Sequence, residues 1–214
     1  MAVEHAPLNK RGLFGAYPQI GVPIGMILAT GLLFFLNSSM SKEDFAAWGW
    51  RVPFLLSIVL IVVGYLIRRA VAESPVFQEM AARKQESKAP LGELIRSHKK
   101  PVLYSTMIFI GNNAAGYLLI AFFIAYATRT LQMPTPQVLL ATTLASFGWL
   151  IFTLAGGWIS DRIGRVKTFL AGYAIIFAWM IPMFALIDTR NIWLYGLALF
   201  VLTIGLGLSY GPMS

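Results

Sequence analysis

The sequence predicts an all-α integral membrane protein with about six transmembrane helices. Of its 214 residues, 57% are hydrophobic and only 12% are charged, whereas a typical soluble domain has roughly 25% charged residues. These charges are too few to cover a water-facing surface. Six apolar runs are long enough to cross a hydrocarbon core of about 30 Å, which takes about 20 residues of helix. The connections between the runs alternate between rich and poor in lysine and arginine.

The first three predicted spans are separated by polar connections. Leu13–Leu36 is the first span, and it follows a polar stretch of mixed charge. Trp50–Ile67 is the second, and it opens on a tryptophan, a residue that favours the membrane interface. Val102–Thr128 is the third, and it is the most polar inside its apolar run. Helices are the predicted form because a membrane-spanning barrel would require short segments of alternating polarity.

The last three predicted spans, Val138–Ile159, Thr168–Ile187 and Ile192–Tyr210, are joined by short connections. Thirteen of the 17 lysines and arginines fall on one side of the predicted membrane and four on the other. Because basic residues are enriched in cytoplasmic connections, both ends of the chain should be cytoplasmic. One missed or invented helix would place rich and poor connections on the same side, so the alternation also supports six spans.

The longest connection, residues 68–101, separates two spans from four. Ser74 can cap a helix that begins at Pro75, and apolar residues such as Leu94 and Ile95 recur among the charges. Short helices on the membrane surface are one interpretation of this connection, and a solvated linker is the other. The predicted organisation is residues 1–67, 68–101 and 102–214.

A charged turn between the fourth and fifth spans carries the pattern G-x-x-x-D-R-x-G-R-x-K. Glycines at the end of a helix permit close contact with another helix, and Gly164 can adopt the positive φ that lets the chain reverse. Asp161 can pair with an arginine or with the positive N-terminus of a neighbouring helix. The simpler alternative is that the basic residues of this turn only fix the topology.

This pattern resembles the short loop found in each half of the major facilitator superfamily. Three further stretches are similar to the fifth and sixth spans of its metabolite:proton symporter family, which contains bacterial carriers of dicarboxylates, citrate, shikimate, proline and betaine. They are Lys10-Arg11-Gly12 followed by Tyr17-Pro18-Gln19-Ile20-Gly21, then Trp48-Gly49-Trp50-Arg51-Val52-Pro53-Phe54, and then Glu73-Ser74-Pro75-Val76-Phe77. The resemblance covers essentially the whole chain.

The resemblance implies that the six spans are spans five to ten of a twelve-helix major facilitator fold, with four spans before Met1 and two after Ser214. It implies a carrier of the bacterial inner membrane that couples symport of a small organic acid or osmolyte to protons by alternating access. Its partners would be the substrate, the proton, the lipid bilayer and the missing spans. The charged turn would then be a gating latch formed by Gly157, Asp161, Arg162, Gly164, Arg165 and Lys167.

Substrate contacts are predicted on the third span. Thr106, Asn113 and Tyr117 share one helix face, and Asn112 lies beside them. Their amide and hydroxyl groups can bind a carboxylate or zwitterion, and Gln19 on the first span is a further candidate. The alternative is that the two asparagines hydrogen-bond neighbouring helices. No acidic residue lies well inside a span, so by resemblance the proton-coupling carboxylate belongs to the absent N-terminal spans.

Other functional classes find little support in the sequence. The chain has no cysteine and only two isolated histidines, so we expect neither a metal site nor a cofactor. The net charge of +8 resides in connections between apolar runs, which argues against nucleic-acid binding. An enzyme would need a cluster of ionisable residues at one membrane depth. The remaining alternative is a self-contained six-span protein that dimerises into a pore or carrier.

Gly21 and Gly25 on the first span form a G-x-x-x-G pattern, which predicts close helix packing. The alternative is that the proline between them lets the helix bend during gating.

Overall fold

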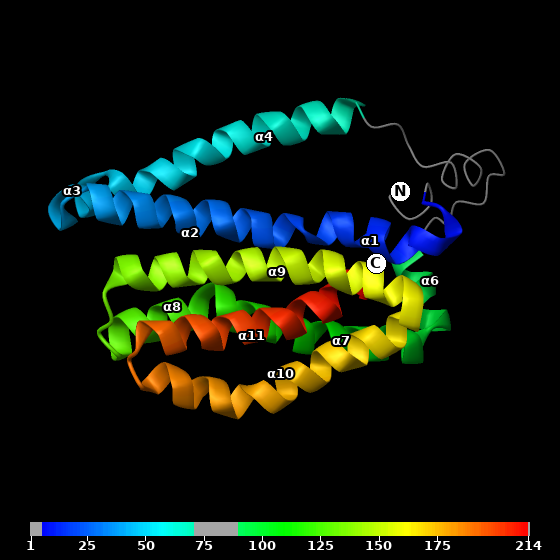
Figure 1. Ribbon diagram of the computed structural model, residues 1–214. Coiled ribbons are helices and arrows are strands. Elements are labelled where there is room, and N and C mark those ends of the chain that lie inside the picture. The colour runs from blue at the N-terminus through cyan, green and yellow to red at the C-terminus, as the bar shows by residue number, and fades with distance from the viewer. Residues whose placement is uncertain (1–5, 71–89, 214) are drawn as a thin grey trace.

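The computed structural model describes residues 6–70 and 90–213, and within them six helical segments are long and apolar enough to cross a membrane. They lie side by side along one direction (Figure 1). The predicted six-span membrane fold is therefore confirmed, and each predicted span lies inside or nearly inside an observed one. The six segments are Arg11–Ser39, Gly49–Arg69, Lys99–Thr130, Thr135–Ile163, Arg165–Asp188 and Ile192–Met213.

The first span is made of two helices, α1 (Arg11–Gln19) and α2 (Gly21–Ser39), which meet at Ile20. Pro18 lies inside α1 and Pro23 lies in the first turn of α2. Proline removes a backbone donor and disturbs the helix that precedes it. The interruption of this span therefore has a cause in the sequence.

A short connection leads to the second span. The Ser41 hydroxyl accepts a hydrogen bond from the Asp44 backbone N–H at 3.0 Å, which caps α3 (Lys42–Ala47). The chain then forms η2 (Gly49–Arg51) and α4 (Val52–Ala70). In Figure 1, α4 lies beside α2 and diverges from it towards its end.

The connection between the second and third spans is described only in its last part. There the chain forms α6 (Pro90–Ser97), which exposes Leu94 and Ile95. A short helix at this place agrees with the helical interpretation of the connection. The predicted helix start at Ser74 and Pro75 lies outside the described residues.

The third span combines α-helical and π-helical turns. It consists of α7 (Lys99–Tyr117), η3 (Leu118–Phe122), α8 (Phe123–Ala125) and η4 (Tyr126–Thr130). The η3 and η4 segments are π-helical, a rare geometry that occurs mostly as single-turn bulges, frequently at functional sites. The apolar pattern of the sequence predicts the helix but contains no signal for these wider turns.

The last three spans are α9 (Thr135–Ile163), α10 (Arg165–Asp188) and α11 (Ile192–Tyr210), which continues into η5 (Gly211–Met213). The α9 helix is central: α1 and α2 pack along one side of it and α11 along another. Figure 1 shows this order, with α4 beyond α2 and α10 beyond α11.

Basic side chains gather at one end of the bundle, which we call the basic end. It is the end where α1 and α7 begin, α4 ends and α9 meets α10 (Figure 1). The lysines and arginines at this end include Lys10, Arg11, Arg68, Arg69, Lys99, Lys100, Arg162, Arg165 and Lys167. Those at the opposite end are Lys42, Arg51, Arg129 and Arg190.

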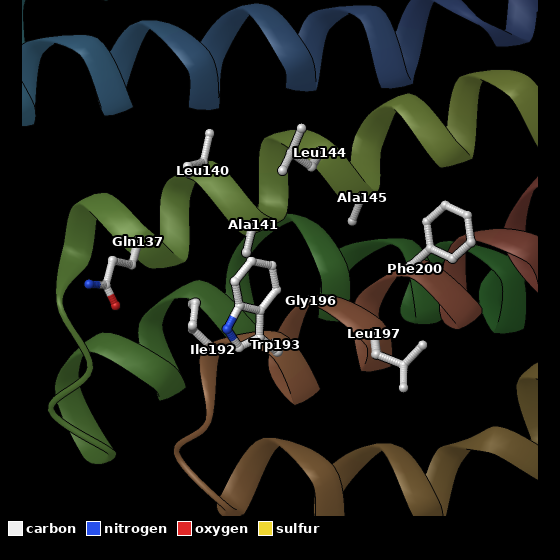
Figure 2. A pocket seen from close by; sticks show the side chains of 10 residues that line it. All are labelled: Gln137, Leu140, Ala141, Leu144, Ala145, Ile192, Trp193, Gly196, Leu197 and Phe200. Atoms are coloured by element: carbon white, nitrogen blue, oxygen red, sulfur yellow. The ribbon is translucent and has the colours of Figure 1, made fainter.

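Outside the helix contacts, the spans expose apolar side chains, as a lipid-facing surface requires. Near the end opposite the basic end, α9 and α11 leave an apolar groove of about 560 Å³ between them (Figure 2). Small residues, Ala141, Ala145 and Gly196, line this groove together with larger ones such as Leu144 and Leu197. Gln137 and Trp193 supply its few polar atoms.

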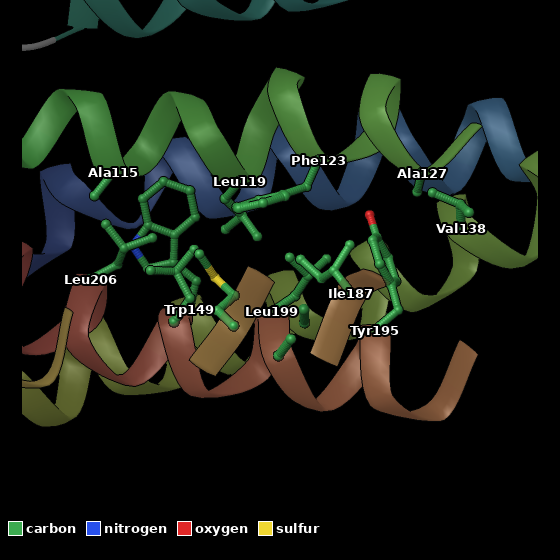
Figure 3. Close-up of a cluster of buried hydrophobic side chains, with 14 of the residues drawn as sticks. Ala115, Leu119, Phe123, Ala127, Val138, Trp149, Ile187, Tyr195, Leu199 and Leu206 are labelled. Atoms are coloured by element: carbon green, nitrogen blue, oxygen red, sulfur yellow. The ribbon is translucent and has the colours of Figure 1, made fainter. Parts of the chain in front are cut away.

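The buried core lies between α7, α8, α9, α10 and α11 (Figure 3). Its largest fully buried side chains include Trp149, Tyr195 and Phe123. The Trp149 indole lies among Ala115 and Leu206, towards the basic end, while Tyr195 lies towards the other end. The core thus ties the last four spans into one unit, against which α1 and α2 pack.

Candidate functional site

Asp161 lies in the last turn of α9, and its carboxylate reaches the first turn of α1. Oδ1 accepts a hydrogen bond from the backbone N–H of Gly12 at 2.6 Å, and Oδ2 accepts one from Leu13 at 3.0 Å. Lys10, at the N-cap position of α1, provides no side-chain hydrogen bond. Asp161 therefore caps α1 from a different helix. The sequence allows two partners for Asp161, an arginine or a helix N-terminus, and in the structure its carboxylate binds the helix N-terminus.

Glycines allow α1, α9 and η5 to come together around this carboxylate. A Cβ atom added at Gly157 would lie 2.7 Å from the Ala16 Cβ and 2.7 Å from the Gly12 carbonyl oxygen. One added at Gly12 would lie 2.6 Å from the Gly157 carbonyl oxygen. Gly211 of η5 approaches the backbone of Gly157 in the same way. We call Gly12, Gly157 and Gly211 the glycine junction.

The rest of the charged turn shapes the connection between α9 and α10. Gly164 has φ +96°, a conformation that favours glycine, as the sequence predicts. The Arg162 guanidinium lies over the Trp158 ring, 3.7 Å from its centroid. Arg165 and Lys167 are exposed in the first turn of α10.

The candidate substrate residues of α7 divide into two groups. Thr106 is exposed and Asn113 is half-buried, and each donates a side-chain hydrogen bond to a carbonyl of its own helix. Tyr117 is 65% exposed. These three side chains share the outer face of α7, as their spacing predicts. Gln19 lies on α1, and no hydrogen bond among the described residues joins it to α7.

Asn112 has a different environment, because it is fully buried between helices. Its Oδ1 accepts a hydrogen bond from the Ser209 hydroxyl of α11 at 2.7 Å, and its Nδ2 donates to the Met213 sulfur at 3.6 Å. Both ends of the amide are therefore used in helix contacts. This geometry favours the interhelical interpretation of Asn112 over a direct substrate contact.

Several residues of this region escape sequence reasoning. Trp149 is buried, and its indole N–H has no hydrogen-bond acceptor among the described residues. Tyr210 packs edge-to-face against it with ring centroids 5.5 Å apart. Thr143 of α9 donates a hydrogen bond to the Thr30 hydroxyl of α2 at 2.8 Å. The sequence holds little signal for these contacts. Gly12 belongs to a stretch that carries the family resemblance, but a single tryptophan or threonine in an apolar run does not indicate which residue it contacts.

The glycines of α2 also differ from expectation. A Cβ atom added at Gly21 or Gly25 would meet nothing within 4 Å among the described residues. The close helix packing predicted for these glycines is therefore not found in the described part of the chain. A groove of about 400 Å³ between α2 and α4 includes Gly25.

Comparison with known proteins places these features in a family. The Major Facilitator Superfamily matches residues 1–214. The inner membrane metabolite transport protein YhjE of Escherichia coli is 33% identical over 100% of this chain and 50% of its own length. A proline/betaine transporter of Salmonella typhimurium is 27% identical over 99% of this chain and 44% of its own length.

A glycine betaine/proline/ectoine/pipecolic acid transporter of Dickeya dadantii is 28% identical, with the same coverage as the Salmonella protein. No solved structure gives a significant match to the chain. The chain spans about half the length of the curated relatives it matches. The chain has six membrane spans, an aspartate at the basic end that caps a helix of another span, and a family match along its entire length. It belongs to the major facilitator superfamily.

Proposed function

We propose that this chain is part of a proton-coupled symporter that moves a small organic acid or osmolyte by alternating access. The observation that carries the proposal is the Asp161 carboxylate bound to the N-terminus of α1. Its relatives are named as transporters of metabolites and of proline and betaine. The proton-coupling carboxylate is expected outside this chain, because the acidic residues of the described spans lie at their ends.

The capped helix and the glycine junction have the properties of a latch. The hydrogen bonds of the Asp161 carboxylate join α1 to α9, two helices that belong to different spans. Movement of one of these helices relative to the other therefore breaks the bonds. Hydrogen bonds to a charged acceptor are strong, yet they break without any covalent change. Loss of the bonds together with separation of the close-packed glycines would open the basic end.

The distribution of basic residues supports a cytoplasmic location for the basic end and for both ends of the chain. The latch would then close the cytoplasmic face of a carrier in the bacterial inner membrane. Its members are Gly157, Asp161, Arg162, Gly164, Arg165 and Lys167, with Asp161 forming the bond and the others shaping and orienting the turn.

A twelve-helix arrangement is the second part of the proposal. Residues 1–67 would end one half of the carrier, residues 68–101 would connect the halves, and residues 102–214 would begin the other half. The unpacked glycine face of α2 and its groove with α4 are suited to receive further spans. The relatives are about twice as long as this chain, which is enough for six more spans.

Thr106, Asn113 and Tyr117 remain the proposed polar face of α7 towards the transport path, with Gln19 as a further candidate. Their exposure on one helix face supports this role. Asn112 instead holds α7 against α11 and η5, because both ends of its amide are hydrogen-bonded to them.

Site-directed labelling tests the latch, because the chain has no cysteine; any cysteine elsewhere in the full-length protein is first replaced by serine, so that an introduced thiol is unique. Thr153→Cys places a thiol at a fully buried position of α9, about 12 Å deeper than Asp161 at 1.5 Å per residue. The test uses the full-length protein that the complete gene encodes, which we call the product of the full reading frame. In it, we expect Asp161→Asn to accelerate several-fold the labelling of the thiol at position 153 by an impermeant maleimide added from the basic end. The same substitution should reduce uptake of labelled organic acids or osmolytes.

Asp188→Asn is the matched control, because Asp188 accepts a hydrogen bond from the Tyr126 hydroxyl at the opposite end of the bundle. It removes the same charge and should leave labelling of Cys at position 153 unchanged. Equal labelling of the Asp161→Asn and parent proteins would contradict the latch. Absence of uptake of every labelled organic acid and osmolyte by the parent would contradict symport.

A further inference from the structure

The indole N–H of Trp149 is a buried donor without a partner. The side chain has no exposed surface, and it is the one side chain among the described residues with a buried nitrogen or oxygen that lacks a hydrogen bond. Buried polar groups are nearly always paired, because an unpaired donor destabilises the folded state. In Figure 3 the nitrogen lies on the side of the ring that faces Ala115 and Leu206, towards the basic end.

An aromatic partner and a glycine surround this indole. Tyr210 of α11 packs edge-to-face against Trp149, with an interplanar angle of 78°. Across from both rings, a Cβ atom added at Gly116 of α7 would lie 3.5 Å from the Tyr210 hydroxyl and 3.8 Å from the Trp149 ring. Both rings therefore converge on the part of α7 that lacks a side chain. The exposed Tyr117 follows directly on that helix.

The cluster is connected to the latch through the backbone. Tyr210 directly precedes Gly211, which packs against Gly157 in the glycine junction. Displacement of η5 from α9 therefore moves Tyr210 relative to Trp149. Because the two rings pack edge-to-face, such a movement would separate them and make room beside the indole.

The chemistry of the cluster selects a class of ligand. It offers an N–H donor, a hydroxyl and two aromatic rings, and it contains no charged side chain. Aromatic faces attract ammonium groups, and the N–H can donate to a carboxylate. A ligand that carries both charges fits such neutral surroundings, whereas a dicarboxylate would bring uncompensated negative charge into the membrane.

We propose that Trp149 and Tyr210 bind a zwitterionic substrate, an amino acid or a betaine, when the basic end opens. The Trp149 N–H donates to the substrate carboxylate, and the Tyr210 ring contacts its ammonium group. This inference rests on the proposed transport function and narrows its substrate class. It also accounts for the unpaired donor, which finds its acceptor in the substrate.

Trp149→Phe is the decisive variant, because it removes the N–H and retains an aromatic ring. In the product of the full reading frame, we expect the KM for labelled betaine or proline to rise about tenfold or more, as loss of a hydrogen bond to a charged group implies. The kcat should change less than twofold. The melting temperature should stay equal or rise, because the variant no longer buries an unpaired donor.

Two further variants complete the test. Tyr210→Phe keeps the ring and should retain most affinity, whereas Tyr210→Leu should raise KM as strongly as Trp149→Phe. Trp193→Phe is the matched control, because Trp193 is 83% exposed at the opposite end, and its kinetics should equal those of the parent.

The outcomes separate this inference from the proposed function. An unchanged KM in Trp149→Phe with intact zwitterion uptake would overturn the site and leave transport standing. Uptake of citrate or succinate without betaine or proline would overturn the substrate class and still support symport. Absence of all uptake by the parent would overturn both.

Discussion

At the scale of single residues, the hydrogen bonds of Asp161 have to be strong enough to hold α1 against α9 and weak enough to break when the basic end opens. A negative charge at a helix N-terminus contributes roughly 0.3–2 kcal/mol, and a hydrogen bond to a charged group contributes about 1.5–3 kcal/mol. Two bonds of this kind join the carboxylate to Gly12 and Leu13. Their sum is of the same order as the few kcal/mol that separate the states of a two-state protein, so ligand binding can offset it.

Gly157→Ala tests whether the glycine junction requires close contact. The new methyl group would lie 2.7 Å from the Ala16 Cβ and from the Gly12 carbonyl, and relief of this overlap should destabilise the chain by about 1–3 kcal/mol. Gly196→Ala is the control, since its nearest neighbour would lie 3.9 Å away; it should be neutral or stabilising by up to about 1 kcal/mol. Thermal unfolding in detergent measures both, and equal melting temperatures would argue against a tight junction.

Local chemistry explains which residues the sequence could predict. The positive φ of Gly164 follows from its residue type at a turn. Asp161 had two predicted partners, and only its contacts with Gly12 and Leu13 identify the helix N-terminus. Asn112 had two interpretations, because an amide in an apolar run binds either a helix or a ligand. Only the three-dimensional contact with Ser209 separates them. The unpaired indole N–H of Trp149 could not be predicted from the sequence, because only the three-dimensional structure shows that no acceptor lies beside it among the described residues.

At the scale of the elements, span existence was predictable and span geometry was not. Apolar length and the alternation of basic connections define all six spans without reference to packing. The break between α1 and α2 has a proline signal, whereas the π-helical turns of the third span have none. The central position of α9 also depends on tertiary contacts that no periodicity encodes.

The contact between α7 and α11 provides a test at this scale. Ser209→Ala leaves the buried Asn112 Oδ1 without its 2.7 Å donor, which should cost about 1–3 kcal/mol. Thr106→Ala is the control on α7, because its exposed hydroxyl bonds only its own helix; we expect a change within about 0.5 kcal/mol. A double-mutant cycle of Ser209→Ala with Asn112→Leu should give a coupling of about 0.5–3 kcal/mol. Simple additivity would show that the bond does not tie the helices together.

At the scale of the whole molecule, packing is uneven. The last four spans share one core, and α1 and α2 pack along α9, while α4 exposes nearly all of its side chains. The relatives contain about twice as much chain, and in the proposed twelve-helix arrangement further spans would cover these open helices. Sequence resemblance predicted the partial fold, but which surfaces stay open required the structure.

These open surfaces predict that the chain does not transport by itself. Added Cβ atoms at Gly21 and Gly25 of α2 meet nothing within 4 Å in the described part of the chain. Thr106 is exposed on α7, and a polar side chain left facing lipid would be costly. Proteoliposomes that contain only this chain should accumulate no labelled proline, betaine or organic acid under an imposed proton gradient. The product of the full reading frame should accumulate at least one of them, and co-reconstitution of the chain with the rest of that product should restore uptake. Accumulation by the chain alone would instead support a self-contained six-span carrier, and cross-linking between copies through α4 would then identify the dimer interface.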